Sequence, residues 1–365
     1  MNEVTIGFLG LGLIGGSIAK GIRRHHKNYT LIGYNHNYST AQAALEEGVL
    51  NLAVKEVDDS FSHCDIIYLC MPVSYNVEYL EKIKPYLKPS CILTDVGSVK
   101  GNIHKAVKEL GLTRYFIGGH PMAGSEKTGY ANSTDHLLEN ACYPLTPCED
   151  TDPKALQFLK ELTASLGALP FVLSEQEHDY AVAAISHLPH LIASGLVNLI
   201  RRVDSKEQLM KTIAAGGFKD ITRIASASPV MWQQICLTNR DNIVKIMEQY
   251  LSYLTEVRDA VLAEDTDYLH RFFETGREYR NSIPAAPSGP VTKIYYLYCD
   301  LIDKPGSIAK AATILADASV SIKNIGITHI REYQEDVLRI EFYTQEDAIL
   351  AGTVLKEHAY QVTQP

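Results

Sequence analysis

The sequence lacks the features that mark a disulfide framework, a zinc ribbon or a polyanion-binding protein. Its seven cysteines are odd in number and form no Cys-x-x-Cys pair, so we expect buried thiols rather than disulfides or metal ligands. No block rich in lysine and arginine occurs, and 34 Lys and Arg against 43 Asp and Glu leave a net charge of -9 and a pI near 5.8. Nucleic acids and anionic membranes are therefore not expected as partners, and small molecules are favoured.

The N-terminus offers no membrane or export signal. The uncharged residues 4–19 contain five glycines, are too few to span a bilayer and have no basic residue before them. They predict neither a transmembrane helix nor a signal peptide, and we expect a cytoplasmic protein. A content of 46% hydrophobic and 21% charged residues is ordinary for a globular chain, and 365 residues suggest two or three domains.

Residues 1–174 alternate short apolar runs with helical patterns. Strands that alternate with helices predict a parallel sheet covered on both faces, the doubly wound α/β arrangement. Ligands of such sheets bind beyond the carboxyl ends of the strands, so polar residues at those ends are candidates for a site. The apolar runs are VTIGFLG, TLIGYN, DIIYLCMP, CILTDVG, RYFIGGHP, ACYPLTP and ALPFVLS.

Gly10, Gly12 and Gly15 form a G-x-G-x-x-G motif between the first apolar run and a helical pattern. Small residues there let the chain turn tightly and let a pyrophosphate approach the N–H groups at a helix N-terminus. The motif predicts a Rossmann domain that binds a dinucleotide; a glycine turn required only for packing is the alternative. The predicted cofactor contacts are Gly10, Gly12, Leu13, Ile14, Gly15 and Asn35, with Pro72, Gly97 and Ser98 after later strands.

Asn35 ends the second predicted strand, where an acidic residue usually binds the ribose of NAD. An amide can still hydrogen-bond a 2′-hydroxyl, and it repels a 2′-phosphate less than a carboxylate does. No arginine follows to attract that phosphate. NAD is therefore predicted over NADP.

Two further strand ends carry side chains suited to catalysis, Ser98 in DVGSVK and His120 in GGHPMAGSE. A histidine has a pKa suited to accepting a proton from an alcohol as hydride leaves, and Ser98 could orient that imidazole or the alcohol. The two glycines before His120 would let the chain pass close to a flat nicotinamide ring. A hydrogen-bonded structural histidine is the alternative, but the joint occurrence of these residues favours catalysis.

Residues 175–283 lack strand signals and predict an all-α domain. Apolar residues at positions 181, 185, 188, 192, 195 and 199 form one helical stripe, and further helices are predicted over residues 242–263 and 266–280. Long helices with apolar stripes bury against each other or against a symmetry mate. We therefore expect a homodimer built by this region.

The apolar stripe contains SHLPH, in which His187 and His190 share a face and Pro189 must kink the helix. The two histidines would suit a metal ion, but no third ligand accompanies them at a supporting spacing, so no metal site is predicted. A kinked core helix and a substrate contact, chiefly by His190, remain as interpretations.

In GGFKDITR, Lys219 and Arg223 are four residues apart and would share a helix face. A solvated basic face is one interpretation. A carboxylate clamp is the other, because a guanidinium holds a carboxylate through two parallel hydrogen bonds. Trp232 is the single tryptophan and is expected to pack in a core.

Residues 284–290 concentrate proline and glycine and predict a linker. The remaining residues 291–365 read as strand, helix, strand, strand, helix and strand, which predicts a separate small α+β domain. The turn DKPG at residues 303–306 ends the first of these strands and starts the first helix.

Together, GLGLIGGS, DVGSVK, GGHPMAGSEKTG, SHLPH, GGFKDITRIA and PVMW resemble the prephenate dehydrogenase family across essentially the whole chain. DKPGSIA and SIKNIGI resemble an ACT regulatory domain. The resemblance implies a Rossmann domain at residues 1–174, a helical dimerisation domain at residues 175–283 and an ACT-like domain at residues 291–365. It also implies the NAD-dependent oxidative decarboxylation of prephenate to 4-hydroxyphenylpyruvate in tyrosine synthesis.

The same resemblance implies roles for single residues. His120 matches the family's base, Ser98 its orienting serine and Arg223 its clamp on the ring carboxylate. His190 matches the histidine that faces the substrate side chain, and further substrate contacts are expected from His187, Gly216, Lys219 and Trp232. Tyrosine is expected to bind the tail as feedback inhibitor near Asp303, Gly306, Ser307, Asn324 and Ile325.

Three alternatives stay open. Arogenate, which carries an amino-acid side chain, could be the substrate. A general β-hydroxyacid dehydrogenase would share the first domain but would need neither GGFKDITR nor the tail. A non-catalytic sensor of NAD and amino acids would have no need of Ser98, His120 and Arg223 together.

Overall fold

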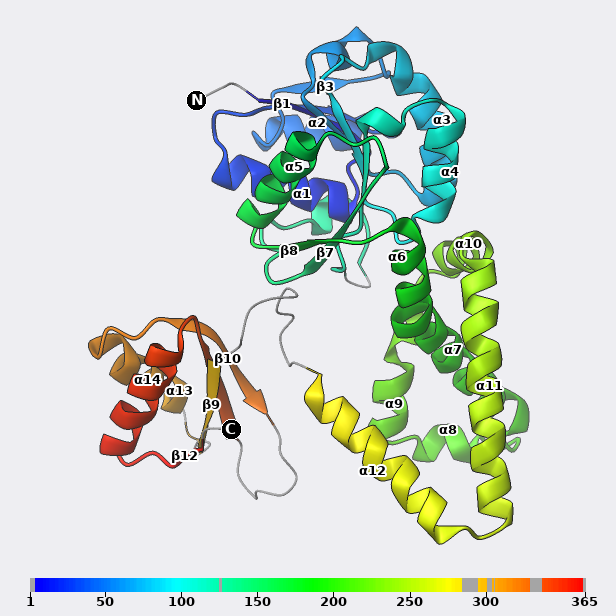
Figure 1. Cartoon of the computed structure of the whole chain (residues 1–365), viewed down its shortest axis with the longest axis vertical. Helices are drawn as coiled ribbons and strands as arrows, with labels where there is room; N and C mark the ends of the chain where they lie inside the picture. Colours follow the sequence, from blue (N-terminus) through cyan, green and yellow to red (C-terminus); the bar gives the residue numbers. More distant parts are fainter. Residues whose placement is uncertain are drawn as a thin grey trace. The chain divides into compact units, whose positions relative to one another are not determined.

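The computed structural model describes residues 4–124, 127–283, 295–300, 304, 306–328 and 337–363. The chain forms two compact units, residues 1–289 and residues 290–365 (Figure 1). The predicted linker at residues 284–290 and the predicted effector contact Asp303 lie outside the described residues.

The first part of unit 1 is built on an eight-stranded sheet with the order β3-β2-β1-β4-β5-β6-β7-β8. Strands β1 to β6 are parallel, whereas β7 pairs antiparallel with β6 and parallel with β8. The expectation of an entirely parallel sheet was therefore wrong for the last two strands. The strands are β1 Thr5–Leu9, β2 Thr30–Tyr34, β3 Leu52–Val54, β4 Ile66–Leu69, β5 Ile92–Asp95, β6 Phe116–Gly119, β7 Cys142–Pro147 and β8 Leu169–Val172.

The segment between β6 and β7 explains the reversal. A connection between parallel strands has to cross over the sheet and usually contains an α-helix. Among the described residues between these strands, the short 3-10 helix η4 (Tyr130–Asn132) is the one regular element. The chain therefore returns beside β6 in the opposite direction.

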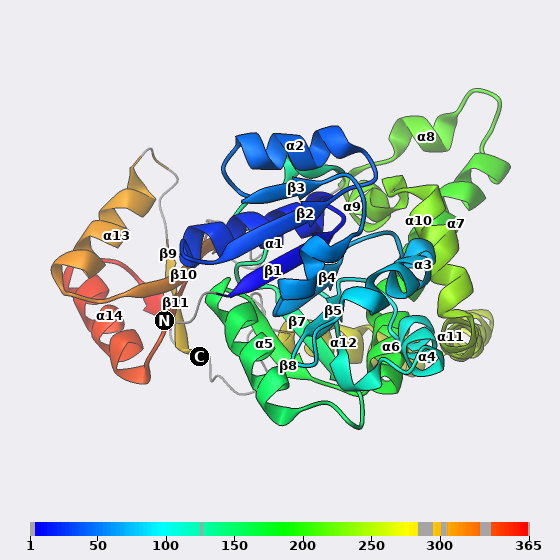
Figure 2. The same ribbon diagram turned by 90° about the horizontal axis from the view of Figure 1, so that it is seen from above.

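Helices cover both faces of this sheet, as the alternating pattern predicted (Figures 1 and 2). On one face three helices, α1, α2 and α5, enclose a core that contains the stacked rings of Phe8 and Tyr68. On the other face α3 and α4 pack against the opposite side of β4 and β5. These helices are α1 Leu13–His25, α2 Tyr38–Glu46, α3 Val73–Ile83, α4 Gly101–Glu109 and α5 Pro153–Ser165.

The second part of unit 1, residues 175–283, is helical throughout its regular elements. It begins at a capping box in which the Ser174 hydroxyl accepts the Glu177 N–H and the Glu177 carboxylate accepts the Ser174 N–H. The helices predicted over residues 242–263 and 266–280 correspond to α11 and α12. The α-helices are α6 Glu175–Val182, α7 Leu188–Val203, α8 Leu209–Ile213, α9 Gly216–Thr222, α10 Pro229–Thr238, α11 Arg240–Leu262 and α12 Thr266–Ser282.

A π-helical turn, η5 (Ala183–His187), joins α6 to α7. Pro189 has no N–H to donate to the carbonyl of Ile185, and its ring would collide with that carbonyl in a regular α-helix. The wider turn accommodates the proline, so the helical run continues from Glu175 to Val203. The disruption that the sequence predicted is therefore a local widening within one continuous run.

Within the part of the chain that the structure describes, Glu175–Val203 is the one helical run long and apolar enough to cross a membrane. The sequence argument against a membrane span considered residues 4–19 and missed this segment. Only 22% of its most apolar window is buried within the chain. Most of the predicted apolar stripe therefore faces away from the interior of unit 1.

Unit 2 is a four-stranded antiparallel sheet with the order β10-β11-β9-β12. Its two helices share one apolar core with the strands, and Figure 1 shows both helices on the same side of the sheet. The strand and helix order agrees with the order predicted from the sequence. The elements are β9 Tyr295–Asp300, α13 Ser307–Asp317, β10 Ile322–Thr328, β11 Val337–Phe342, α14 Gln345–Glu357 and β12 Val362–Thr363.

Candidate active site

The glycine motif makes a tight turn between β1 and α1. Gly10 has a φ of +103°, and a Cβ on Gly15 would lie 2.5 Å from the Gly10 carbonyl oxygen, so both positions require glycine. A Cβ on Gly12 would meet no atom of the described chain within 4 Å. The middle glycine therefore leaves space open where helix α1 begins.

The N-terminus of α1 fits the pyrophosphate of a dinucleotide. Gly12 is the N-cap residue, and within the described chain no side chain caps the helix and no acidic residue lies in its first turn. The N–H groups of the first turn, which contains Leu13 and Ile14, therefore remain available to a phosphate oxygen. Pro72 follows β4 and Gly97 follows β5, the strands next to β1. Both loops therefore lie at the same edge of the sheet as the glycine turn.

Asn35 holds the glycine turn in place. Its Oδ1 accepts the Leu11 N–H at 2.9 Å, and its Nδ2 donates to the carbonyl of Asn37 at 3.1 Å. A carboxylate could accept the first of these bonds but could not donate the second. The amide therefore has a structural role in addition to the predicted contact with the cofactor.

His120 starts a chain of hydrogen bonds that leads from the end of β6 into α6. Its Nδ1 lies 2.8 Å from Nε2 of His178, and the two rings meet edge to face with their centroids 5.1 Å apart. Nδ1 of His178 lies 2.8 Å from Oδ1 of Asp179. The His178 side chain is 1% exposed. A histidine in the Rossmann part is thus joined to two buried polar residues of the helical part.

Asp179 extends this chain to the N-terminus of α4. Its Oδ1 accepts the Lys100 N–H and its Oδ2 accepts the Gly101 N–H, both at 2.8 Å. Its backbone carbonyl accepts Nδ2 of Asn239 at 2.7 Å. A carboxylate that satisfies the first N–H groups of a helix stabilises that helix end. Asp179 therefore caps a helix of the Rossmann part from a position in the helical part.

A buried ion pair fixes the loops that carry Ser98 and His120. The Lys100 ammonium donates to the Asp95 carboxylate and to the carbonyl of Gly119 at 2.6 Å, and the two charged side chains are 0% and 1% exposed. Asp95 also accepts N–H groups on both loops, at 2.8 Å from the residue before Ser98 and at 3.1 Å from the residue before His120. Removal of either charge would leave the other buried and unpaired.

The glycines before His120 serve a different purpose from the one predicted. A Cβ on Gly118 would lie 2.3 Å from Oγ1 of Thr146, and a Cβ on Gly119 would lie 2.7 Å from the carbonyl oxygen of Asp95. The neighbouring strands β5 and β7 therefore occupy the space that a side chain would need. The expectation that these glycines open room for a nicotinamide ring was wrong, because they permit close packing within the sheet.

The electrostatic environment keeps the imidazole of His120 neutral and the carboxyl of Asp179 ionised. Burial lowers the pKa of His120 well below its usual value, and His178, Lys100 and His187 lower that pKa further. Burial alone would raise the pKa of Asp179. Hydrogen bonds from His178 and from two backbone N–H groups nevertheless hold the pKa of Asp179 below its usual value. At neutral pH His120 is therefore able to accept a proton.

His187 and His190 both contact Trp232. The His190 ring stacks on the indole with centroids 3.6 Å apart, and His187 meets the indole edge-on at 5.9 Å. Nδ1 of His187 accepts Nδ2 of Asn239 at 3.2 Å, and burial lowers the pKa of His187 to about 4. Nδ1 of His190 donates to the carbonyl of Ser186 at 2.9 Å. Trp232, expected in a core, instead forms a stacking surface whose Nε1 is buried without a partner in the described chain.

Arg223 lies close to His190. Burial lowers the pKa of His190, and the charge of Arg223 lowers it further. Helix α9 ends before Arg223, which opens the 3-10 helix η6 (Arg223–Ser226). Lys219 and Arg223 therefore do not share one continuous α-helix, as the spacing had suggested. Lys219 and Gly216 are exposed on α9, and both α9 and η6 pack against α7, the helix of His190.

The remaining predicted residues lie as follows. Ser98 is half-buried in the loop after β5, two residues before Lys100. Gly306 and Ser307 begin α13, and Asn324 and Ile325 lie on β10, so these four belong to unit 2. Among the described residues, no three or more His, Cys, Asp or Glu side chains are grouped to hold a metal ion.

His178, Asp179, Asn239 and the ion pair of Lys100 and Asp95 were missed as parts of the site. Asp95 and Lys100 stand in the same DVGSVK motif as Ser98, but nothing in the sequence pairs their charges. A signal for the others exists in SEQEHD: a capping box starting at Ser174 places His178 and Asp179 in the first turns of a helix. The contact with His120 could not be predicted, because it joins residues 58 apart in the chain.

Two protein-family models match the chain. The model described as "Prephenate dehydrogenase, nucleotide-binding domain" matches residues 18–171, and the model described as "Prephenate dehydrogenase, dimerization domain" matches residues 174–275.

Individual proteins with known names are similar over long stretches. Prephenate dehydrogenase of Bacillus subtilis (strain 168) is 38% identical over 363 residues, 98% of this chain and 98% of its own. The crystal structure of prephenate dehydrogenase from A. aeolicus, in complex with hydroxyphenyl propionate and NAD+, has a TM-score of 0.73 and 31% identity, covering 78% of this chain and 99% of its own. Arogenate dehydrogenase of Synechocystis has a TM-score of 0.71 and 32% identity, covering 77% and 100%. The similarity to the B. subtilis protein thus extends into unit 2.

Proposed function

This chain belongs to the prephenate dehydrogenase family, and from that premise we propose that it catalyses the NAD-dependent oxidative decarboxylation of prephenate to 4-hydroxyphenylpyruvate. The observation that carries the proposal is the combination, at one edge of the sheet, of an open N-terminus on α1 and a neutral His120. This combination suits oxidation of an alcohol, in which one group takes the hydroxyl proton and a dinucleotide takes the hydride.

The substrate dictates what the protein must supply. Prephenate carries a ring hydroxyl, a ring carboxylate opposite it and a pyruvyl side chain. Bound NAD supplies the acceptor for the hydride that leaves the hydroxyl-bearing carbon. The ketone that forms draws electrons from the bond to the ring carboxylate, so carbon dioxide leaves and the ring becomes aromatic. The chain must therefore place a base at the hydroxyl and cations at the two carboxylates.

We assign these tasks to the predicted residues. His120 accepts the hydroxyl proton and Ser98 orients the hydroxyl. Arg223 holds the ring carboxylate, and His190 faces the side chain. This assignment is supported by the effect of Arg223 on the pKa of His190 and by the stacking of His190 on Trp232. His187, Gly216, Lys219 and Trp232 complete the pocket, and the cofactor contacts are Gly10, Gly12, Leu13, Ile14, Gly15, Asn35, Pro72, Gly97 and Ser98.

The test is the initial rate of NADH formation when purified protein meets prephenate and NAD, with arogenate and NADP measured alongside. We expect the highest kcat/KM with prephenate and NAD. A higher kcat/KM with arogenate would assign the substrate named for the Synechocystis relative instead. No reduction of either dinucleotide with either substrate would overturn the proposal and favour a sensor of NAD and amino acids.

We propose that unit 2 is an ACT-like regulatory domain that binds tyrosine as feedback inhibitor. The support is its βαββαβ order and the turn at Gly306, which has a φ of +90° and precedes α13. The predicted contacts are Asp303, Gly306, Ser307, Asn324 and Ile325. Tyrosine should inhibit the full chain and not a shortened chain ending at Ser282. A shortened chain with full activity and unchanged tyrosine sensitivity would overturn this assignment.

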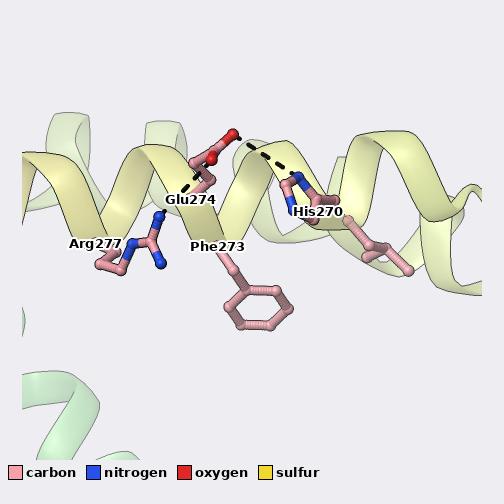
Figure 3. A pocket seen from close by; sticks show the side chains of 5 residues that line it. His270, Phe273, Glu274 and Arg277 are labelled. Atoms are coloured by element: carbon pink, nitrogen blue, oxygen red, sulfur yellow. Dashed lines mark ion pairs between the residues drawn. The ribbon is translucent and has the colours of Figure 1, made fainter. Parts of the chain in front are cut away.

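We also propose that the helical part forms a homodimer, which agrees with the description of the family model for residues 174–275. The support is the set of large apolar side chains that the described chain leaves exposed on α7, α11 and α12. Phe273 is an example: it is 69% exposed, and Figure 3 shows it projecting from α12 on a helix that also carries Glu274 between His270 and Arg277. Sedimentation as a monomer at micromolar concentration would contradict the dimer.

A further inference from the structure

The chain of hydrogen bonds that runs from His120 into the helical part fixes the positions of protons. Asp179 is a carboxylate at neutral pH and has no proton to donate. Nδ1 of His178, 2.8 Å away, must therefore carry the proton of that bond. In a neutral His178 the other ring nitrogen, Nε2, then has a free lone pair and can only accept.

The same reasoning fixes the tautomer of His120. Nε2 of His178 accepts, so Nδ1 of His120, at 2.8 Å, has to donate. A neutral imidazole carries a single ring proton, and this one is held at Nδ1. Nε2 of His120 is then the nitrogen without a proton. The order of donors and acceptors along His120, His178 and Asp179 therefore makes one nitrogen of His120 a proton acceptor before any substrate binds.

We infer that His178 and Asp179 are positioning residues: they hold His120 in the tautomer with a bare Nε2 and stabilise the positive charge that His120 gains in the reaction. This inference rests on the proposed function, because it gives His120 a substrate hydroxyl to deprotonate. It is independent of the substrate's side chain and of the regulatory role proposed for unit 2.

The step balances with the groups already named. The O–H bond of the substrate breaks, and its proton forms a new bond to Nε2 of His120. The hydroxyl-bearing carbon loses its hydride to the oxidised dinucleotide. The bonding pair of the departing carboxylate enters the ring, and carbon dioxide leaves. His120 ends as an imidazolium whose Nδ1–H still donates to His178, which in turn donates to the charged Asp179.

The charges around His120 show why such support is needed. Lys100, buried at the start of α4, lies close enough to oppose a second positive charge, and His187 on η5 acts in the same direction. Asp95 on β5 is already paired with Lys100. Asp179 on α6 is the carboxylate connected to His120 through a hydrogen-bonded ring. His104 on α4, a further buried histidine near these groups, bonds instead to Thr146 at 2.9 Å.

The first experiment compares two replacements of His178 in the full chain. His178→Gln keeps an oxygen that can accept from His120 and an N–H that can donate to Asp179, whereas His178→Leu keeps neither. We expect kcat with prephenate to fall by about 10²-fold or more in H178L and by about tenfold or less in H178Q. As matched control, His104→Gln removes a buried histidine outside the chain and should change kcat by less than about threefold.

The pH dependence separates a positioning role from a merely structural one. The acid limb of kcat/KM reports protonation of His120 in the free enzyme. In H178L the imidazolium loses its acceptor while Lys100 still faces it, so the limb should move to lower pH. An unmoved limb would mean a structural role for His178. A limb that moves to higher pH would mean that His178 itself carries charge, and either result overturns the inference.

The second experiment needs no substrate. Nitrogen-15 chemical shifts of the histidine side chains distinguish Nδ1–H from Nε2–H, and the His120 signals are identified by their loss in His120→Asn. We expect His120 to be in the Nδ1–H form in the wild type and in H178Q, and to populate the Nε2–H form in H178L. An Nε2–H form in the wild type would overturn the inference even if the enzyme is active. An inactive wild type with the expected tautomer would instead refute the proposed function.

Discussion

The two parts of unit 1 bury their apolar residues to very different extents. The Rossmann part encloses two large apolar clusters, one on each face of its sheet. The core of the helical part contains only Ala183, Leu188, Ile243 and Ile246 as buried members. Its 23-residue helix α11 buries three residues and α12 buries none. The most exposed of its large apolar side chains, Leu262, is 76% accessible.

This difference indicates what each part needs from outside the chain. The Rossmann part is complete as a folded body and leaves open only the N-terminus of α1, where a ligand is expected. The helical part has the composition of a core without the surface to cover it, and large exposed apolar areas mark interaction sites. A second copy of the chain would bury that area, and each apolar side chain so buried contributes about 1.5–3 kcal/mol. The catalytic histidine stands where these two parts meet.

The largest expected effect comes from removing the base at that boundary. His120→Asn should lower kcat by about 10²- to 10⁴-fold, the usual contribution of general-base catalysis, while both parts stay folded. The measurement is kcat with saturating prephenate and NAD, together with the circular dichroism spectrum as control. A loss below threefold in a folded variant would remove His120 from the chemistry.

Placing a charge on α12 should break the helical part and spare the Rossmann part. Phe273→Asp puts a carboxylate on the proposed interface twice, once per copy, so the dimer dissociation constant should rise by about 10²-fold or more. Sedimentation equilibrium measures it. Leu52→Asp is the matched control, because Leu52 is 42% exposed on β3 of the Rossmann part. Equal effects of both substitutions would mean that α12 is not at the interface.

A pair of glycine variants should sharpen the contrast between fold and ligand site within the Rossmann part. Gly12→Ala adds a methyl group where the described chain has no atom within 4 Å, so Tm should be unchanged while NAD affinity falls by about tenfold. Gly15→Ala drives a methyl group against the Gly10 carbonyl and should lower Tm. Isothermal titration with NAD and differential scanning calorimetry measure the two effects. Unchanged NAD affinity in G12A would place the pyrophosphate elsewhere.

The smallest expected effect concerns the joint between the parts. The pKa of Asp179 is lowered in the folded chain, so its capping of α4 adds stability above the unfolded pKa of about 3.9. That stability is lost as pH falls through the folded pKa. Asp179→Asn should remove about 1–2 kcal/mol at pH 7, and the difference from the wild type should shrink as the pH is lowered. Thermal unfolding at several pH values tests this, and a difference independent of pH would contradict it.

How much of this could be predicted depended on the distance over which each signal acts. The glycine motif, the capping box and the helix periods are local, and the elements they predict appear in the structure. The reversal of β7 and the purpose of Gly118 and Gly119 depend on which strands become neighbours, and the sequence does not state this. For the same reason Ser98 and His120 could be singled out as strand-end residues, whereas His178 could not be assigned to His120.

The π-turn at Ala183–His187 gives the region a particular sensitivity to length. A π-turn amounts to one additional residue in a helix, and each residue of an α-helix turns the chain by about 100°. Deleting a single residue before His187 would let the run return to α-helical geometry and would rotate everything after it by that angle. His190 would then leave the face of Trp232, although every side chain involved was still present. Within this segment, a gap of one position in an alignment of relatives is therefore expected to matter more than many substitutions.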